Sequence, residues 1–410
     1  MCEQSFDSVS LEKVVDILDH LRVPINAIER FDRAGSVPYY GANGLQGWID
    51  RPLFDEPLIL VAEDGGNFDD FATRPIAYRI EGPSWVNNHA HIIRAKCGIS
   101  QSFLFWSLVH KDIRRYIAGG TRTKLTQGEL RRVYINLPHA TEQQIIAQIL
   151  DTLDTAIHET EAIIEKLKAV KQGLLHDLLT RGIDANGGLR PPQSEAPHLY
   201  KNSPLGWIPN EWDTFTLGSV TNWASGGTPD RGVASFWHGK IPFLAPKDMK
   251  KFLLQETSEF ITSKALQAGS KLMPPNSVFI VVRGMILAHS FPVVLSDRPM
   301  AFNQDIKAIT SGPNLNGRFL AHWFVANSPQ FLRRVTEATH GTKKLDLKDL
   351  LSMPIAVPSI EEQTLVVERQ ESLDDRIEQE RASLIKLQKQ KSGLMDDLLT
   401  GRVRVTPLLK

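Results

Sequence analysis

Two stretches of the chain carry apolar residues at alternating steps of three and four, separated by long polar faces. That spacing is typical of a heptad seam, in which one narrow apolar stripe packs against a partner helix. Each stretch predicts a helix of about 37 residues, or roughly 55 Å at 1.5 Å per residue. The seam positions are Ile146, Leu150, Leu153, Ile157, Ile164, Leu167, Leu174 and Leu178, and then Val366, Leu373, Ile377, Leu384, Leu387, Leu394 and Leu398.

The ends of both helices are marked in the sequence. The motif Ser359-x-x-Glu362 predicts a capping box at the start of the second helix. His139 takes the place of the serine in the first stretch, so we expect a cap that is weaker there or that moves to Thr141. Gly182 and Gly401 follow the last seam residues and predict the C-terminal ends.

The two helices belong to an internal repeat. Residues 124–180 align with residues 344–400 without a gap, and roughly 20 of the 57 positions are identical, where chance gives about three or four. A weaker match sets residues 6–11 over residues 212–217. A repeat that packs on itself approximates a two-fold axis, so we expect the two helices to run antiparallel.

The segments before each helix read as short strands cut by Gly and Pro turns, with helices expected over residues 102–117 and 317–335. The predicted fold class is α+β: two globular domains separated by a pair of long antiparallel coiled-coil helices, in a pseudo-two-fold internal repeat. The expected boundaries are 1–137 for the first domain, 138–182 for the first helical spacer, 183–204 for a Gly/Pro-rich linker, 205–357 for the second domain and 358–402 for the second helical spacer.

Composition and charge narrow the class of protein. The 47 Lys and Arg residues balance the 47 Asp and Glu residues, which argues against a uniformly basic surface. Residues 1–120 hold 12 basic and 16 acidic side chains, a net charge of −4, whereas residues 203–340 hold 13 and 9, a net charge of +4. Two cysteines cannot form a disulfide framework, and no apolar run approaches the roughly 18 residues of a membrane span. We therefore expect a cytoplasmic protein that does not associate with a membrane.

Several motifs occur in a characteristic order. They are Pro38-Tyr-Tyr-Gly-Ala-Asn-Gly44, Gly206-Trp-Ile-Pro209 followed by Trp212, Gly226-Gly-Thr-Pro229, Phe302-Asn-Gln-Asp-Ile306 and the helix that is written twice. Together they resemble the DNA-specificity subunit of type I restriction–modification systems, over essentially the whole chain. The first copy departs from the pattern, because it lacks the Gly-Trp-Ile-Pro lead-in and has Arg22-Val-Pro24 where the second has Gly-Gly-Thr-Pro. Trp207 and Trp212 are both expected in the core.

The resemblance implies a division of labour. Subunits of that family carry two target recognition domains, each of which reads one half of a split site in double-stranded DNA, while the paired helices set the distance between the halves. The subunit has no catalytic centre or cofactor of its own. It assembles with two modification subunits, which methylate adenine with S-adenosylmethionine, and restriction subunits add ATP-driven translocation and cleavage.

The residues themselves agree with a non-catalytic chain. There is no Asn-Pro-Pro-Phe/Tyr or Asp-Pro-Pro-Phe/Tyr tetrapeptide for adenine methylation, no Gly-x-Gly nucleotide loop after a strand and no Gly-Lys-Ser/Thr phosphate loop. Asp346-x-Lys348 resembles a nuclease fragment, but such triplets are common. We predict no catalytic and no metal-binding residues. Two alternatives are a coiled-coil scaffold protein and a duplicated DNA-modifying enzyme that acts alone.

Candidate DNA contacts follow from side-chain chemistry, because Asn and Gln pair with adenine, Arg and Lys pair with guanine, and both cations hold phosphates. Each candidate has a structural alternative, such as turn formation for Asn43 or strand packing for Tyr39 and Tyr40. His89 and His91 alternate along a strand, so at most one of them faces DNA. The candidates are Tyr39, Tyr40, Asn43, Asn87, Asn88, His89 and Lys124 in the first domain, and Thr228, Lys247, Arg283, Asn303, Gln304 and Lys344 in the second.

Overall fold

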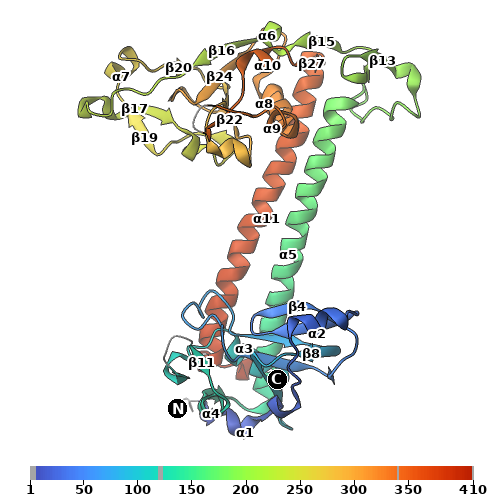
Figure 1. Ribbon diagram of the computed structural model, residues 1–410, viewed down its shortest axis with the longest axis vertical. Helices are drawn as coiled ribbons and strands as arrows, with labels where there is room; N and C mark the ends of the chain where they lie inside the picture. The colour runs from blue at the N-terminus through green and yellow to red at the C-terminus, as the bar shows by residue number, and fades with distance from the viewer. Residues whose placement is uncertain (1–5, 119–122, 339–340, 409–410) are drawn as a thin grey trace. The chain divides into compact units, whose positions relative to one another are not determined.

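The computed structural model describes residues 6–118, 123–338 and 341–408, which fold into two compact units (Figure 1). The first unit comprises residues 1–162 and 381–410, and the second comprises residues 163–380. Each unit holds one mixed α+β domain together with part of each long helix, so the predicted α+β fold class is confirmed.

Both predicted long helices form. Helix α5 is Ala140–Thr180 and helix α11 is Ile360–Thr400, with 41 residues each. All of the predicted apolar seam positions are buried or half-buried, and the polar residues Thr160 and Lys171, which fill two seam positions, are buried and half-buried. The 3–4 spacing therefore identified the packed stripe of each helix.

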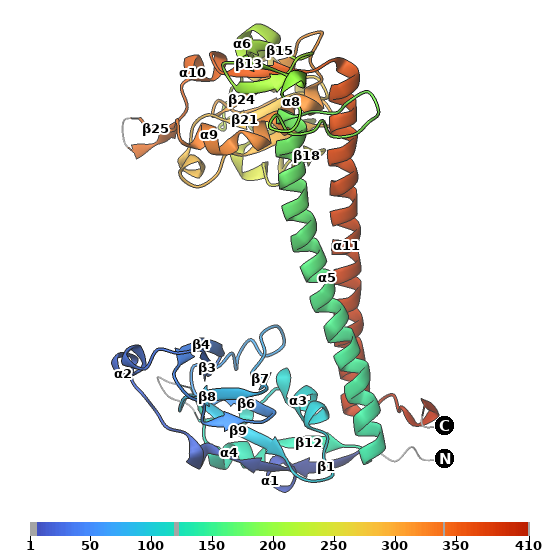
Figure 2. The same ribbon diagram turned by 90° about the vertical axis from the view of Figure 1, so that its right-hand side faces the viewer.

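The two helices run antiparallel within each unit, where they lie side by side (Figures 1 and 2). In the first unit, Glu142 pairs with Arg404 and Asp154 pairs with Lys391 further along α5. In the second unit, Lys171 pairs with Asp374. The residue numbers along α5 rise while those of their partners on the second helix and just after it fall. The two helices therefore point in opposite directions, as the repeat predicted.

The first domain is built on two four-stranded sheets (Figure 2). One is antiparallel with the order β2-β9-β6-β7, and the other has the order β4-β3-β8-β5 with β3 parallel to β8. The strands are β2 Val15–Ile17, β3 Val37–Gly41, β4 Gly44–Ile49, β5 Phe54–Asp55, β6 Leu58–Ala62, β7 Ala77–Ile80, β8 Pro83–Val86 and β9 Ala90–Ala95. Further elements are β1 Asp7–Ser10, α1 Leu11–Val14, α2 Ala27–Asp32, α3 Gln101–Val109, β10 Ile117–Ala118, β11 Lys124–Leu125, α4 Gln127–Arg132 and β12 Tyr134–Leu137.

The second domain repeats this plan. Its sheets have the orders β16-β24-β21-β22-β18 and β19-β17-β23-β20, and β17 runs parallel to β23. The strands are β16 Thr221–Ser225, β17 Trp237–Leu244, β18 Leu253–Leu254, β19 Glu259–Ile261, β20 Leu272–Met273, β21 Val278–Val281, β22 Val293–Ser296, β23 Met300–Phe302 and β24 Ile306–Ser311. Further elements are β13 Tyr200–Ser203, β14 Gly206–Pro209, β15 Asp213–Thr216, α6 Leu217–Val220, α7 Ser263–Gln267, α8 Gly317–Ala326, α9 Ser328–Leu332, β25 Thr336–Glu337, β26 Lys343–Lys344, α10 Leu347–Leu351 and β27 Pro354–Val357.

Three local expectations were wrong. The helix predicted over residues 102–117 ends at Val109, and the one over residues 317–335 divides into α8 and α9 at Asn327. Pro329, in the first turn of α9, has no N–H with which to continue the hydrogen bonding of α8. Trp212 is fully buried, but Trp207 is 53% exposed because it alternates with buried Ile208 along the two-stranded hairpin β13–β14.

The starts of the two long helices also differ from the predicted caps. Ser359 Oγ accepts the Glu362 N–H at 3.2 Å, which is one half of the predicted capping box. The Glu362 carboxylate makes other bonds instead, to Arg190 at 2.5 and 3.1 Å and to Trp212 at 3.0 Å. Helix α5 begins at Ala140, directly after His139, so the cap does not move to Thr141.

A repeated Glu-Gln dipeptide joins each domain to its long helix. Gln143 accepts the backbone N–H of Ser100 at 2.9 Å, and Gln363 accepts that of Asn316 at 2.7 Å. Ser100 and Asn316 are the N-caps of α3 and α8, so the same bond holds the same pair of helices in both units. The preceding glutamates, Glu142 and Glu362, are buried and each pairs with an arginine that follows a long helix.

Candidate nucleic-acid interface

Equivalent loops leave the parallel strand pair in each domain. In the first domain Tyr40 pairs with Val86, and the chain continues into residues 87–89 before β9. In the second domain Leu244 pairs with Phe302, and the chain continues into residues 303–305 before β24. Residues predicted independently from the two halves therefore fall at matching places in the fold.

Matching asparagines hold these two loops. Asn87 Oδ1 accepts the His89 N–H at 2.8 Å, and Asn303 Oδ1 accepts the Asp305 N–H at 3.1 Å. The two asparagines are only 4% and 8% exposed, and Tyr39 is 2% exposed, with its ring 4.7 Å from the Arg30 guanidinium. These three candidate residues shape the loops and present little surface to a ligand.

The next residue of each loop is exposed. Asn88 and Gln304 occupy this position, so each domain presents a carboxamide at the same point. Gln304 Oε1 accepts the Thr228 hydroxyl at 2.5 Å, which places two second-domain candidates in contact. A carboxamide can accept and donate at once, as recognition of an adenine edge requires.

Asn43 and Lys247 occupy equivalent places in the two domains, because each follows the first strand of its parallel pair. Asn43, in the exposed turn between β3 and β4, donates to the Gly65 carbonyl at 2.8 Å, so it has the turn role that was its structural alternative. Lys247 follows β17 and lies 3.2 Å from Glu259, which also pairs with Arg231. Tyr40 is half-buried and its ring lies 6.0 Å from that of Tyr78.

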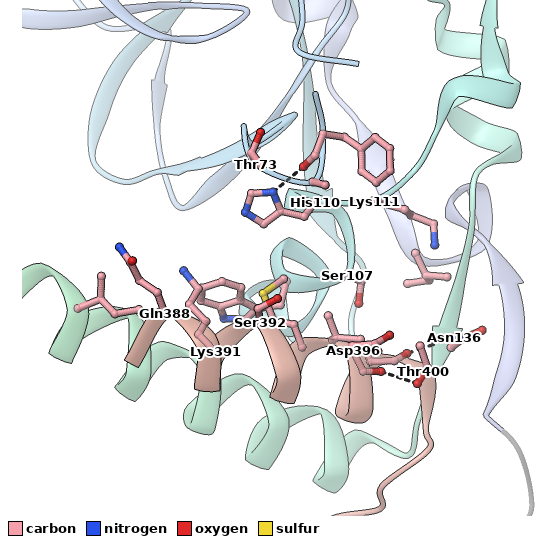
Figure 3. Close-up of a pocket in the computed structure, with 17 residues that line it drawn as sticks. Thr73, Ser107, His110, Lys111, Asn136, Gln388, Lys391, Ser392, Asp396 and Thr400 are labelled. Atoms are coloured by element: carbon pink, nitrogen blue, oxygen red, sulfur yellow. Dashed lines mark hydrogen bonds between the residues drawn. The ribbon is translucent and has the colours of Figure 1, made fainter. Parts of the chain in front are cut away.

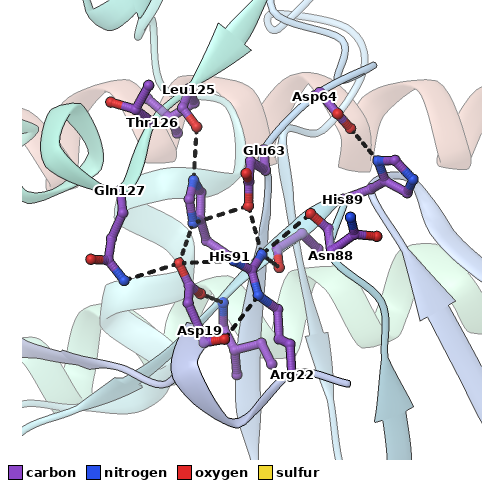
Figure 4. A network of polar contacts seen from close by, with 12 residues as sticks. Asp19, Arg22, Glu63, Asp64, Asn88, His89, His91, Leu125, Thr126 and Gln127 are labelled. Carbon is purple, nitrogen blue, oxygen red and sulfur yellow. Dashed lines mark hydrogen bonds and ion pairs between the residues drawn. The ribbon is translucent and has the colours of Figure 1, made fainter. Parts of the chain in front are cut away.

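Of the two histidines only His89 is exposed, because it lies in the loop before β9, whereas His91 lies on the strand. The expectation from strand alternation gave the wrong reason, since residues two apart on a strand share a face. His89 is exposed, and its Nδ1 lies 2.6 Å from Asp64 (Figure 4). His91 is buried, with Nδ1 2.6 Å from Asp19 and Nε2 2.8 Å from the Leu125 carbonyl. His89 therefore belongs to the exposed loop, whereas His91 belongs to a polar network beneath it.

Asp19, Arg22, Glu63 and His91 form that buried network (Figure 4), and its carboxylate Glu63 also holds Lys124. Lys124 lies 2.9 Å from Glu63, and Arg22 lies 2.6 Å from the same carboxylate. Burial acts to raise the pKa of Glu63, but the hydrogen bonds from Lys124 and Arg22 and the nearby charges lower it overall. The pKa of Asp19 is likewise lowered, because His91, the Ile92 N–H and Arg22 outweigh its burial.

The network also contains three groups that could bind a metal. Ligand atoms of Asp19, Glu63 and His91 lie within 4.8 Å of one another. Arg22 and Lys124 already supply two positive charges to these carboxylates. The cluster is therefore charge-compensated by the chain itself, and we assign it to stabilising the loops.

In the second domain, Lys344 has the place of Lys124. Isolated bridges join Lys124 to Asp64 and Lys344 to Arg283. Lys344 pairs with Asp346 at 3.1 Å, and Arg283 is exposed. The sequence reasoning missed Asp64, Glu63 and Arg22, since nothing in the local pattern indicates that they surround Lys124.

A groove of about 770 Å³ lies elsewhere on the first unit, between α3 and the C-terminal part of α11 (Figure 3). Its wall includes Trp106, Met395 and Lys391, whose Nζ lies 4.7 Å from the Trp106 ring centroid. None of the candidate DNA contacts lines this groove, so it is separate from the loops described above.

The fold defines a class of proteins with two related α+β domains, each joined to one copy of a duplicated long helix. A family model described as "type I restriction modification DNA specificity domain" matches residues 4–169 and 209–389. The match covers most of the chain, and the protein belongs to this family.

Known relatives agree with that assignment. The chain is 34% identical over 179 residues to the EcoR124I/EcoR124II specificity subunit of Escherichia coli, which is 43% of this chain and 44% of that protein. It is 26% identical over 317 residues to a putative MjaX specificity subunit of Methanocaldococcus jannaschii, covering 75% and 69%. The first alignment thus spans less than half of the relative's length.

A solved structure has the same fold. The S subunit of a type I restriction–modification system from M. genitalium superposes with a TM-score of 0.60 at 14% identity, over 97% of this chain and 98% of that one. Both relatives are named as specificity subunits, in agreement with the prediction of a DNA-specificity subunit. No helix in the described part of the chain is long and apolar enough to span a membrane.

Proposed function

We propose that the chain is the non-catalytic DNA-recognition subunit of a type I restriction–modification complex. Each domain reads one half of a two-part site, and the helix pair sets the distance between the halves. The observation that carries the proposal is the duplicated loop arrangement, which offers Asn88 and His89 in one domain and Gln304 with Arg283 in the other. Equivalent scaffolds with different exposed groups suit two half-sites of different sequence.

The candidate residues divide into two roles under this proposal. Asn88, His89 and Lys124 in the first domain, and Thr228, Lys247, Arg283, Gln304 and Lys344 in the second, are exposed or half-buried and form the DNA-facing set. Tyr39, Tyr40, Asn43, Asn87 and Asn303 support the loops. Each helix is about 60 Å long, which exceeds the roughly 34–36 Å of one DNA turn.

The partners follow from the same proposal. Two modification subunits dock on the chain and methylate adenine, and restriction subunits complete the full complex in the cytoplasm. The chain contributes recognition and carries neither a catalytic group nor a cofactor.

Reconstitution tests the proposal. The purified chain is combined with DNA and S-adenosylmethionine, with and without the modification subunits of the same system, and methylated adenines are mapped. We expect sequence-specific methylation only when both components are present. Methylation by the chain alone would favour the stand-alone enzyme, and partner binding without any sequence-specific methylation would favour the scaffold.

A further inference from the structure

Arg283 of the second domain occupies the backbone position that Asp64 occupies in the first domain. The central strands β6 and β21 end in the same way, because the Glu63 N–H donates to the His89 carbonyl and the Val282 N–H donates to the Asp305 carbonyl, both at 2.9 Å. The residues that follow, Asp64 and Arg283, each form an isolated bridge to the lysine of the repeat. Arg283 therefore occupies the place of Asp64.

Arg283 is also the candidate cation of its domain that is free to bind. Within residues 6–118, 123–338 and 341–408, Lys247 pairs with Glu259 and Lys344 pairs with Asp346, but no partner is found for the Arg283 guanidinium. An exposed arginine without such a partner keeps all of its donors available.

The backbone holds Arg283 on a sharp turn. Gly284 has φ +136°, a conformation that side-chain-bearing residues rarely adopt, and its N–H donates to the Lys343 carbonyl at 2.9 Å. Met285 follows and is 63% exposed. The turn thus presents one guanidinium and one apolar side chain from a segment fixed by backbone hydrogen bonds.

We infer that Arg283 selects a guanine in the half-site read by the second domain, an inference that rests on the proposed function. A guanidinium can donate two parallel hydrogen bonds to guanine O6 and N7 in the major groove. In the first domain Asp64 can only accept when ionised, and it lies against His89, so it disfavours the same guanine edge. The two half-sites consequently differ at the equivalent step.

The competing role for an exposed arginine is a phosphate contact. A phosphate contact weakens binding about equally for all sequences, whereas a guanine contact changes the preference at one position. Mapping sequence preference, and not affinity alone, separates the two roles.

The experiment uses the full chain with its modification subunits, and methylated sites are mapped for wild type, Arg283→Ala, Arg283→Gln and Arg298→Ala. Arg298 is the matched control, since it pairs with Glu256 near the opposite end of β21. We expect both Arg283 variants to lose about 5- to 150-fold of the guanine preference at one position of one half-site. All other positions, and the whole site of Arg298→Ala, stay as in wild type.

The outcomes are distinguishable. A variant is compared only if its melting temperature matches wild type, and two Arg283 substitutions guard against a single misfolded protein. Unchanged preference, or a uniform loss over all sequences, overturns the role of Arg283 and leaves the proposed function intact. A wild-type complex without any sequence preference overturns both.

Discussion

Lys171 of α5 donates a hydrogen bond to Asp374 of α11, and the repeat places the same two residue types in contact a second time. Lys391 and Asp154 are their counterparts at a shift of 220, and they form the corresponding pair in the first unit. The duplication has therefore preserved a contact as well as a sequence. Polar pairs within an apolar seam favour one register of the helices over its alternatives.

The first prediction concerns this pair. Lys171→Asp leaves two carboxylates facing each other, and Asp374→Lys leaves two ammonium groups, so each single variant lowers the melting temperature. Because the side chains are only partly buried, we expect a loss of about 0.5–1 kcal/mol for each. The double variant restores the pair with reversed polarity, and a melting temperature no higher than that of either single variant would contradict the assignment.

The second prediction concerns the buried pair of Arg190 and Glu362. Both side chains are about 10% exposed, so Arg190→Met leaves a buried carboxylate without its cation. We expect a loss of about 3 kcal/mol, measured by thermal or denaturant unfolding. Arg402→Met is the control, because its pairs with Asp396 and Asp397 are exposed, and it should change stability only slightly.

The third prediction concerns pH. Burial lowers the pKa of His322 from 6.5 to about 3, and the charges of Lys171 and Arg318 act in the same direction. The unfolded chain binds more protons at this histidine than the folded chain does between these two values. Its contribution to stability is therefore complete above pH 6.5 and is lost as the pH falls toward 3.

His322→Phe tests this expectation. The imidazole stacks on Phe252 at 4.6 Å, and its Nε2 has no hydrogen-bond partner among the described residues, so a phenyl ring suits the site. We expect the variant to lose less stability than wild type between pH 6.5 and 4, in melting curves recorded across that range. The exposed His198→Phe serves as the control, and an identical pH profile for wild type and His322→Phe would contradict the prediction.

The fourth prediction concerns the helix pair as a spacer. Seven residues inserted after Ala162 and seven after Ala382 leave both Lys–Asp pairs on their own sides of the insertions. The helices lengthen by about 10 Å. We expect mapped methylation sites to keep both half-site sequences while the unread spacer grows by at most about three base pairs, and a change in the half-site letters would exclude the spacer role.

The long helices were predictable because heptad spacing and a gapless repeat act over many residues. The caps at the helix starts were less predictable. The Glu362 carboxylate bonds to Arg190, which lies far away in sequence, and does not complete the capping box with Ser359. Trp207 shows the same limit: composition favours burial of a tryptophan, but its face on a two-stranded hairpin decides the outcome.

The candidate loops were found only in part. Asn87 and Asn303 share a hydrogen-bonding role, but a single asparagine in otherwise different sequences gives no alignment signal. The match between Asp64 and Arg283 is even less visible, because the shared feature is a backbone position and the side chains have opposite charge.

The Glu-Gln dipeptide at the start of each long helix has an evolutionary consequence. The glutamine bonds to a main-chain N–H that any helix start can supply, so the joint makes few demands on the sequence of the domain attached to it. Recombination between genes could exchange an entire α+β domain at this point, and the new domain would still dock on the long helix. New DNA specificities would then arise by exchange of whole domains, without gradual substitution of residues on an existing surface.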